Sequence, residues 1–194
     1  MELNENLKIK GFAFFSLKFF IVEKLGEKFY KEFLSLLPAN LMKFFNQEIG
    51  ESEYYPIKAY FESIDYLCKI YKEDIEELMF RIGEFSVKRA YEGPFKVIAD
   101  TLDFKSFTNN VIEFGYKFFF NFGNFEVKEL NFEKGKATFS LSNIPFKDFK
   151  FEKRIEGGIY SVFKIKGLKN LKSKITKSIA KGEGYIEIKL NWEP

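Results

Sequence analysis

The spacing of apolar residues changes close to Gly123, and this change limits the fold more than any other feature of the chain. Before Gly123, apolar side chains recur every three or four residues, as they do in amphipathic helices. After it they alternate with polar residues, as they do in strands with one buried face. The 194 residues are enough for one such domain. We therefore expect a single α+β domain, with a mainly helical layer over residues 1–122 and a hairpin, a helix and a second hairpin over residues 123–194.

The first half should contain several amphipathic helices separated by proline and glycine. The apolar run from Gly11 to Val22 is too short to span a membrane, so it predicts a core helix. Pro56 is well placed at a helix start, and the Gly93-Pro94 pair should end another helix. The expected helices cover residues 11–22, 25–37, 41–45, 56–71, 73–92 and 103–121, with a linker over 50–55.

The second half should form four antiparallel strands in two hairpins joined by a helix. A first strand ends near Phe132, and a turn at 133–135 leads into a strand whose apolar residues share one face. The segment 149–165 predicts a crossing helix, which Gly157-Gly158 soften because glycine has a low helix propensity. The last two strands are expected over 171–179 and 185–192, on either side of a turn at 181–184. This layer would form a sheet on which the N-terminal helical bundle packs.

The chain contains no histidine, and this absence excludes several classes of function. It removes the usual general base, the Ser-His and Cys-His nucleophile pairs, the commonest zinc ligand and a proximal-histidine haem. Cys68 is the one cysteine, and without an activating histidine it is interpreted as a small buried hydrophobe. The sequence also lacks a P-loop, a dinucleotide fingerprint and a calcium loop. We therefore predict a non-enzymatic protein with no catalytic residues, no metal site and no cofactor.

The basic residues are unevenly distributed. The formal charge is +3, from 31 basic and 28 acidic residues, which makes nucleic acid an unlikely partner. Between Lys164 and Lys181, however, seven lysines occur with no acidic residue among them. They form either a solvated strand face that limits aggregation, or a stripe that meets phosphates, acidic lipid or an acidic partner. Lys177 falls on the same alternating face as Ile175 and Ile179, so a bulge should rotate it outward.

Several short segments carry a resemblance to a known superfamily. They are Lys8-Ile9-Lys10-Gly11, Leu25-Gly26 followed by Phe29 and by Leu34 to Pro38, Tyr55-Pro56, Glu156-Gly157-Gly158, and the closing stretch from Gly182 to Trp192. Together with the element order, they resemble the vinyl-4-reductase-like sensory domain superfamily, and within it a bacterial group known from myxobacteria. That superfamily is similar in fold to the haem nitric-oxide-binding domains. The resemblance implies a domain that binds a small ligand beside signalling modules or partner subunits.

Two departures from this superfamily limit what the resemblance implies. Its members often place cysteines near the final hairpin, whereas Ser178 and Tyr185 stand at comparable places here, so a cysteine-bound metal is not expected. Haem-binding relatives use a histidine ligand, which this chain lacks, so a haem sensor of that type is excluded on chemical grounds. An apolar or aromatic pocket remains compatible with the resemblance.

An aromatic pocket between the helical layer and the sheet is the candidate ligand site. Its expected ligand-binding residues are Phe85, Arg89, Phe114, Phe118 and Tyr160. Arg89 continues an apolar stripe, so its side chain is expected to point inward. Its guanidinium could bind a carboxylate or phosphate on a ligand, or form an ion pair with a carboxylate such as Glu113. Alternatively, its methylene groups are buried and the guanidinium reaches the surface. The rings of the 103–121 helix are either core, pocket lining or a dimer interface.

The first functional hypothesis is a cytoplasmic small-molecule-binding or sensory domain. Its ligand would be apolar or amphipathic, and a homodimer or a protein partner would report occupancy. The alternative is a scaffold protein with no ligand, whose Phe-rich helix or Lys-rich sheet face docks a protein or an anionic partner. A third hypothesis, nucleic-acid binding through Lys164 to Lys181, predicts an affinity that falls steeply with salt. The cytoplasmic setting is expected from the lone cysteine and the lack of a signal peptide or membrane span.

Overall fold

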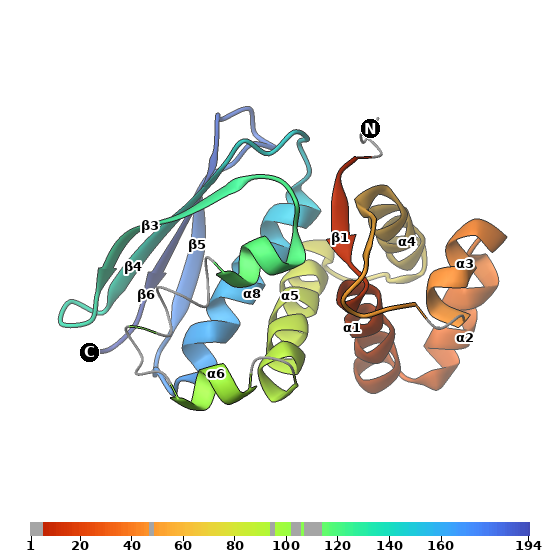
Figure 1. The fold of residues 1–194 in the computed structure, drawn as a ribbon, viewed down its shortest axis with the longest axis horizontal. Helices are drawn as coiled ribbons and strands as arrows, with labels where there is room; N and C mark the ends of the chain where they lie inside the picture. The colour runs from red at the N-terminus through yellow and green to blue at the C-terminus, as the bar shows by residue number, and fades with distance from the viewer. Residues whose placement is uncertain (1–5, 47–48, 94–95, 102–105, 107–113) are drawn as a thin grey trace. The chain divides into compact units, whose positions relative to one another are not determined.

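The computed structural model describes residues 6–46, 49–93, 96–101, 106 and 114–194 (Figure 1). The contacts between Cα atoms divide the chain into two compact units. Unit 1 comprises Met1–Ile75 and Phe118–Asn121, and unit 2 comprises Glu76–Lys117 and Phe122–Pro194. The helix predicted over 73–92 therefore groups with the sheet rather than with the earlier helices.

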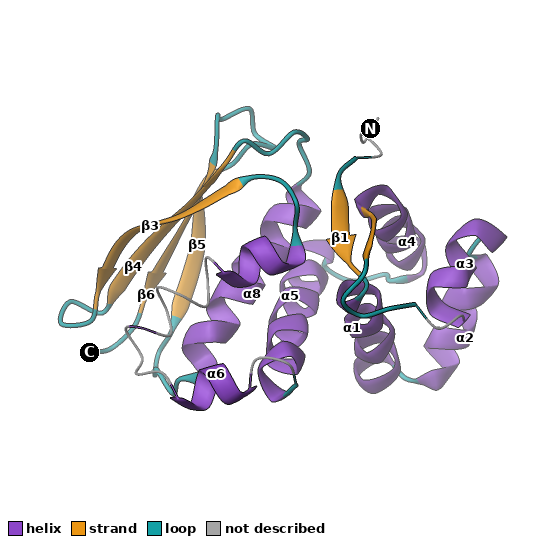
Figure 2. Cartoon of the chain, viewed as in Figure 1, coloured by secondary structure: helices purple, strands orange, loops and turns teal. Residues whose placement is uncertain are grey.

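Unit 1 contains helices and a small two-stranded sheet (Figure 2). Its elements are β1 (Lys8–Lys10), α1 (Phe12–Phe20), the π-helix η1 (Ile21–Leu25), α2 (Glu27–Leu36), α3 (Ala39–Asn46), β2 (Tyr54–Pro56) and α4 (Ile57–Ile70). The predicted helices of this region are confirmed, but the linker over 50–55 is wrong at its end. There β2 pairs antiparallel with β1 and places Tyr55 opposite Ile9. Because this pairing joins segments far apart in the sequence, no local pattern reveals it.

Two glycines shape the chain in unit 1. Gly11 lies against the carbonyl oxygen of Gly50, where a Cβ would not fit. The Gly11 N–H donates to the Glu53 oxygen at 2.8 Å, which fixes the loop before β2. Gly26 follows η1 with a φ of 96°, and its N–H donates to the Ile21 oxygen at 2.9 Å, the bond pattern of a π-helix.

Aromatic rings fill the core of unit 1. The Phe14 ring stacks on Phe44 with centroids 4.6 Å apart and meets Tyr60 edge-on at 5.4 Å. The Phe33 ring meets Phe45 edge-on at 5.1 Å, and all five side chains are buried. The phenylalanine-rich composition therefore serves packing here. Helix α1 contributes to this core as predicted, and none of the helices that the structure describes is long and apolar enough to cross a membrane.

Unit 2 contains a four-stranded antiparallel sheet with helices beside it (Figure 1). Its elements are α5 (Ile75–Glu92), α6 (Lys96–Thr101), β3 (Asn124–Asn131), β4 (Lys136–Ser142), α8 (Phe149–Ile165), β5 (Lys172–Lys177) and β6 (Ile186–Asn191). Residues 114–119 are also helical, and 114–117 of them belong to unit 2. The strand order is β3-β4-β6-β5, so the two hairpins meet where β4 pairs with β6. The α+β class and the order hairpin, helix, hairpin are confirmed, and the crossing helix has its predicted bounds.

The third strand of the predicted sheet is shorter than expected. It ends at Lys177 instead of Ile179, and its register against β6 shifts between Ile175 and Lys177. This irregularity confirms that a bulge rotates Lys177 outward, where its Nζ lies 3.0 Å from Glu183 Oε1. Ile179 is buried in the following turn with 5% of its surface exposed, so it still contributes to the core.

Helices α5 and α8 cross with their backbones in close contact. A Cβ at Gly83 would fall on the carbonyl oxygen of Arg154, and a Cβ at Gly157 would fall on that of Phe80. A larger residue at either position would push the helices apart, because the neighbouring atoms belong to backbone and cannot rotate away. Helix α8 continues through the Gly157-Gly158 pair, and Gly157 makes room for α5. That the pair softens the helix stays a prediction.

Candidate functional site

The face of α8 that lies against the sheet carries charged as well as apolar residues. The Phe163 ring packs against Phe139 and Trp192, with centroids 5.8 and 5.3 Å apart. Glu152 and Glu156 belong to the same face of the helix and are only 2% and 3% exposed. Buried carboxylates require hydrogen-bond donors, so the groups around them define a candidate site.

Glu152 binds the turn between β5 and β6. Its Oε2 accepts a hydrogen bond from Ser178 Oγ at 2.7 Å, and its Oε1 accepts one from the Ala180 N–H at 2.8 Å. The Ser178 N–H donates to Glu183 at 2.6 Å, and Ser178 Oγ accepts from the Lys181 N–H at 3.2 Å. One buried serine thus connects the α8 carboxylate to the whole turn.

A surface ion pair closes the same turn. The Ser178 N–H and, after it, the Lys177 ammonium lower the pKa of Glu183. In return, the hydrogen bond with Glu183 and its negative charge raise the pKa of Lys177. The two side chains are 45% and 37% exposed, so solvent screens their attraction. The backbone hydrogen bond to Glu183 is therefore the main constraint on this side of the turn.

Glu156 connects three elements. Its Oε1 accepts from Ser173 Oγ of β5 at 2.9 Å, and its Oε2 accepts from Lys153 Nζ at 3.1 Å. Lys153 Nζ also lies 3.3 Å from Glu76 of α5. Burial alone lowers the pKa of Lys153, but the hydrogen bonds and charges of Glu156 and Glu76 outweigh burial, and the pKa is raised. Side chains thereby link α5, α8 and β5.

This site is a closed network rather than a reactive one. Both carboxylate oxygens of Glu152 and of Glu156 accept hydrogen bonds from the protein itself. In the part of the chain that the structure describes, no group of three or more histidine, cysteine, aspartate or glutamate side chains is placed to hold a metal ion. The arrangement holds α8 against the β5–β6 hairpin, so a movement of one would carry the other with it.

This network was not predicted from the sequence. A usable signal is nevertheless present in the sequence. Glu152 and Glu156 interrupt the apolar stripe of Ile155, Ile159 and Phe163 at spacings of three and four residues. An acidic residue on a buried stripe predicts a buried acceptor, and the nearby serines of β5 and its turn are suitable donors.

Three of the predicted ligand-binding residues lie on α5 and α8. Phe85 and Arg89 are one turn apart on α5, and Phe85 is 8% exposed while Arg89 is half-buried. Tyr160 of α8 meets Phe80 edge-on at 5.2 Å, and Lys164 Nζ lies 5.7 Å from the Tyr160 ring centroid. Phe80 is about 140° around α5 from Phe85, given 3.6 residues per turn. Tyr160 therefore meets a different side of α5 from the one that carries Phe85 and Arg89.

The other two predicted ligand-binding residues fall in different units. Phe114, in unit 2, is 56% exposed. Phe118, in unit 1, has Lys10 Nζ 5.5 Å from its ring centroid and contacts the Phe119 ring at 5.3 Å. The Phe104, Phe107 and Val111 part of the predicted stripe, its Asp103 cap and the proposed Arg89 partner Glu113 all lie outside the described residues.

Tyr116 is the buried ring of this helical segment. Within unit 2 its ring stacks on Phe125 with centroids 5.7 Å apart. It is 6% exposed, and burial raises the pKa of its hydroxyl. The side of the segment that packs on the sheet is therefore the one that carries Tyr116.

Cys68 is half-buried, so the prediction that it is fully buried is wrong. The neighbouring Leu67 is 0% exposed and occupies the inward position of α4 instead. Both residues are close to the apolar stripe, and the bulkier leucine takes the core side.

The lysine stripe is partly neutralised. Lys164 Nζ lies 2.6 Å from Glu84 Oε1, and this hydrogen bond raises the pKa of Lys164. Lys177 pairs with Glu183 in the turn. Two of the seven lysines, Lys164 and Lys177, are therefore paired in space with carboxylates from other segments.

No model of a known protein family matches the sequence, and no curated protein matches it. Several solved structures are nevertheless similar in fold. An H-NOX protein from S. oneidensis in the Fe(II)NO ligation state has a TM-score of 0.72 at 14% identity, over 96% of this chain and 100% of that chain. An unliganded Fe(II) H-NOX protein from K. algicida has a TM-score of 0.69 at 12% identity, over 96% and 97%. An oxygen-binding H-NOX domain related to soluble guanylate cyclases has a TM-score of 0.70 at 12% identity, over 96% of each chain. This chain therefore has the fold of an H-NOX domain along nearly its whole length.

Proposed function

We propose that this chain is a sensory domain that binds a small molecule, is not an enzyme, and does not use a histidine-bound haem. One observation carries the proposal: the chain matches an H-NOX structure over 96% of its length, yet it contains no histidine. The similar structures include an Fe(II)NO state and an oxygen complex, so the fold holds small ligands in those proteins. The same fold with a different set of side chains supports a different ligand here.

The residues of this chain do not fit the haem that the fold suggests. A histidine-type sensor holds the iron through a proximal imidazole. This chain has no imidazole, and its one thiol, on Cys68, is half-buried on α4. We therefore assign the ligand to another chemical class, a small apolar or amphipathic molecule.

The finer parts of this proposal rest on the sequence. Because Phe118 belongs to unit 1, the proposed ligand-binding set is limited to the expected residues of unit 2, which are Phe85, Arg89, Phe114 and Tyr160. Phe85 and Arg89 support this set, because they put an aromatic ring and a guanidinium on one side of α5. The domain would report occupancy in the cytoplasm through a homodimer or a protein partner, as its resemblance to the vinyl-4-reductase-like domains implies.

Native mass spectrometry of the purified protein tests the proposal. We expect a mass above that of the denatured chain, with the difference recovered as a small organic molecule on extraction. We also expect no Soret absorption, either as purified or after gel filtration of protein mixed with haemin. A stoichiometric Soret band that survives gel filtration would overturn the proposal.

Substitution of Arg89 tests the ligand-binding residues. A charge-assisted hydrogen bond to the ligand contributes about 1.5–3 kcal/mol, so Arg89→Ala should weaken binding of the extracted molecule by about tenfold or more. Lys88→Ala removes a neighbouring exposed cation from the same helix and should leave the affinity unchanged. Equal affinities of the folded variants would remove Arg89 from the site.

Exposed apolar side chains in unit 2 favour a second candidate function, a scaffold that docks a protein and holds no ligand. Phe114 is 56% exposed and Val97 is 74% exposed. Aromatic side chains at a surface are enriched in protein interfaces. A protein that is empty in native mass spectrometry but still dimeric would replace the sensory function with this one.

A further inference from the structure

Strand β5 lies at one edge of the four-stranded sheet. The order β3-β4-β6-β5 gives it β6 as a neighbour, and no other strand among the described residues pairs with its second side. An edge strand presents a row of unpaired N–H and C=O groups. The second side of β5 is therefore a template on which an extended segment of another protein can add as a strand.

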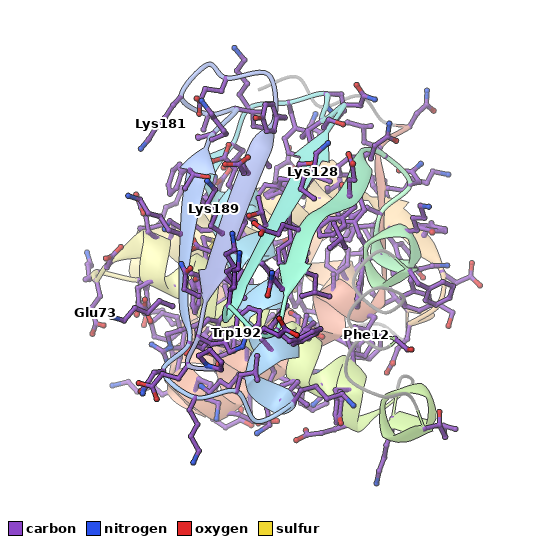
Figure 3. The ribbon with its side chains drawn as sticks, turned by 90° about the vertical axis from the view of Figure 1, so that its left-hand side faces the viewer. Phe12, Glu73, Lys128, Lys181, Lys189 and Trp192 are labelled. Atoms are coloured by element: carbon purple, nitrogen blue, oxygen red, sulfur yellow. The ribbon has the colours of Figure 1, made fainter. Side chains whose placement is uncertain are left out.

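The exposed face of β5 carries lysines without acidic neighbours. Lys172 and Lys174 are exposed, and neither forms an ion pair with any residue that the structure describes. The register places Lys174 directly opposite Lys189 of β6. Like charges that face each other across two strands destabilise a sheet. Figure 3 looks onto this face of the sheet and labels Lys189 on it.

Lysines elsewhere on the same face have acidic neighbours. Lys136 Nζ lies 2.7 Å from Glu129 Oε1, and Lys189 Nζ lies 3.5 Å from Glu187 Oε1. Because the two β5 lysines have no such neighbour within the described residues, uncompensated positive charge gathers along the edge strand. Coulombic attraction along this edge favours a partner with negative side chains.

Protection against aggregation explains only part of this pattern. Lysines on an edge strand prevent sheets from associating, and this role accounts for Lys172 and Lys174. It does not account for Lys189, which lies opposite Lys174 on β6, a strand with neighbours on both sides. Lys189 pairs with Glu187, which offsets only part of its repulsion of Lys174. A negatively charged partner beside Lys174 would offset the rest when it binds.

We propose that β5 binds an extended acidic segment of a partner protein as an added strand. Its backbone would bond to the free edge of β5, with acidic side chains at alternate positions beside Lys172 and Lys174. The residues between them would be small or apolar and would cover Ser173 and Ile175, which are half-exposed on the other face. The alternation of acidic and apolar residues follows from the pleat of the sheet. This surface is separate from the proposed ligand site and does not depend on it.

The charge distribution favours a protein segment over a polyanion. Glu126, Glu129 and Glu187 lie on the same exposed face as the lysines. A nucleic acid or an anionic bilayer would bring phosphates close to these carboxylates, and the repulsion would oppose binding. A single strand added at the edge of β5 meets the lysines, and β5 separates it from the carboxylates on β6 and β3.

The experiment uses the full chain and a fluorescent peptide of about eight residues in which glutamate and valine alternate, a length that matches a typical strand. We expect saturable binding that weakens as salt is raised, with chemical-shift changes at the backbone amides of residues 172–177. A second peptide with the same sequence and N-methyl groups on all of its backbone amides keeps the charge but cannot form the ladder. Its binding should be lost, and this comparison needs no change to the protein.

Charge-reversal variants supply the matched comparison. The pair Lys172→Glu and Lys174→Glu should weaken peptide binding by about tenfold or more, as loss of close charge pairs does elsewhere. The pair Lys28→Glu and Lys31→Glu makes the same charge change at exposed positions of α2 and should leave binding unchanged. The proposal is overturned by no binding of the first peptide, by equal binding of the N-methylated peptide, or by tighter binding of single-stranded DNA or phosphatidylglycerol vesicles.

Discussion

Glu152 is a buried carboxylate whose described partners are neutral, the Ser178 hydroxyl and the Ala180 N–H. Glu152→Ala would leave the hydroxyl of the buried Ser178, and the Ala180 N–H, without this acceptor. The free energy of unfolding should therefore fall by about 1–3 kcal/mol, the usual consequence of a buried unsatisfied group. Urea denaturation measures this loss.

Glu133→Ala is the control for that loss. Glu133 is exposed in the turn between β3 and β4, so its removal should change the free energy of unfolding by less than about 0.5 kcal/mol. If both variants unfold at the same urea concentration, Glu152 does not hold the β5–β6 turn.

Glu183 should titrate below the ordinary range of a glutamate. The Ser178 N–H is the largest cause of the lowered pKa, and the Lys177 ammonium adds to it. Because the unfolded chain takes up the proton at higher pH, the stabilisation from this group is present above the ordinary glutamate pKa and is lost as pH falls through the lowered one. An NMR titration of the side-chain carboxyl carbon measures the pKa directly.

Substitution of the lysine separates the two causes. Lys177→Met should raise the pKa of Glu183 in part, because the Ser178 N–H still donates. Lys136→Met removes a lysine paired with Glu129 elsewhere in the sheet and should leave the titration of Glu183 unchanged. A Glu183 that titrates normally in the unmodified protein would contradict the described turn.

The position of a single residue was predictable where a repeating pattern determined which face of its helix or strand it occupies. Lys177 is an example, because a lysine on an apolar strand face implies the bulge that the structure contains. Cys68 was misplaced because two adjacent apolar residues compete for one inward position, and periodicity does not separate them. Glu152 was missed because its donors come from the distant turn that follows β5.

At the scale of elements, the crossing of α5 and α8 depends on two glycines. Gly83→Ala and Gly157→Ala would each place a Cβ on a backbone carbonyl oxygen of the facing helix. Because the backbone cannot rotate away, each substitution should lower the free energy of unfolding by about 1–3 kcal/mol, as overpacked cores do. Thermal and urea unfolding of the two variants measure the effect.

Gly115→Ala is the matched control for the crossing. Gly115 is also helical, but a Cβ there would meet nothing within 4 Å. Alanine is a better helix former than glycine by about 1 kcal/mol, so this variant should be as stable as the unmodified protein or more stable. Should Gly83→Ala behave like Gly115→Ala, the helices would not be in backbone contact.

Elements with a long periodic pattern were predictable, and those defined by pairing alone were not. Helix α8 was predicted with its observed bounds because its stripe extends over 17 residues between a cap and a glycine-containing turn. Strands β1 and β2 have three residues each, too few for an alternation to be read. They exist because Lys8–Lys10 and Tyr54–Pro56 bond to each other.

At the scale of the whole molecule, the fold is similar to that of known proteins, whereas the side chains that could carry the chemistry differ. The chain keeps the H-NOX fold at 12–14% identity to the solved structures, so the fold tolerates replacement of most of its residues. Histidine is not among the residues it keeps, which removes the usual iron ligand while the architecture remains. The fold alone therefore does not determine the chemistry of this chain, which depends on the residues present.

Dimerisation is the remaining whole-molecule prediction, and Phe114 is the residue on which it depends. A two-fold interface uses the same surface on both copies, so one exposed ring contributes twice. Burial of a phenylalanine side chain contributes about 1.5–3 kcal/mol, and Phe114→Ser should therefore raise the dimer dissociation constant by about a hundredfold or more. Leu36→Ser removes an apolar side chain that is 41% exposed on α2 and should leave the constant unchanged. Sedimentation velocity over a range of concentrations measures both, and an unmodified protein that sediments as a monomer throughout would exclude a homodimer as the signalling form.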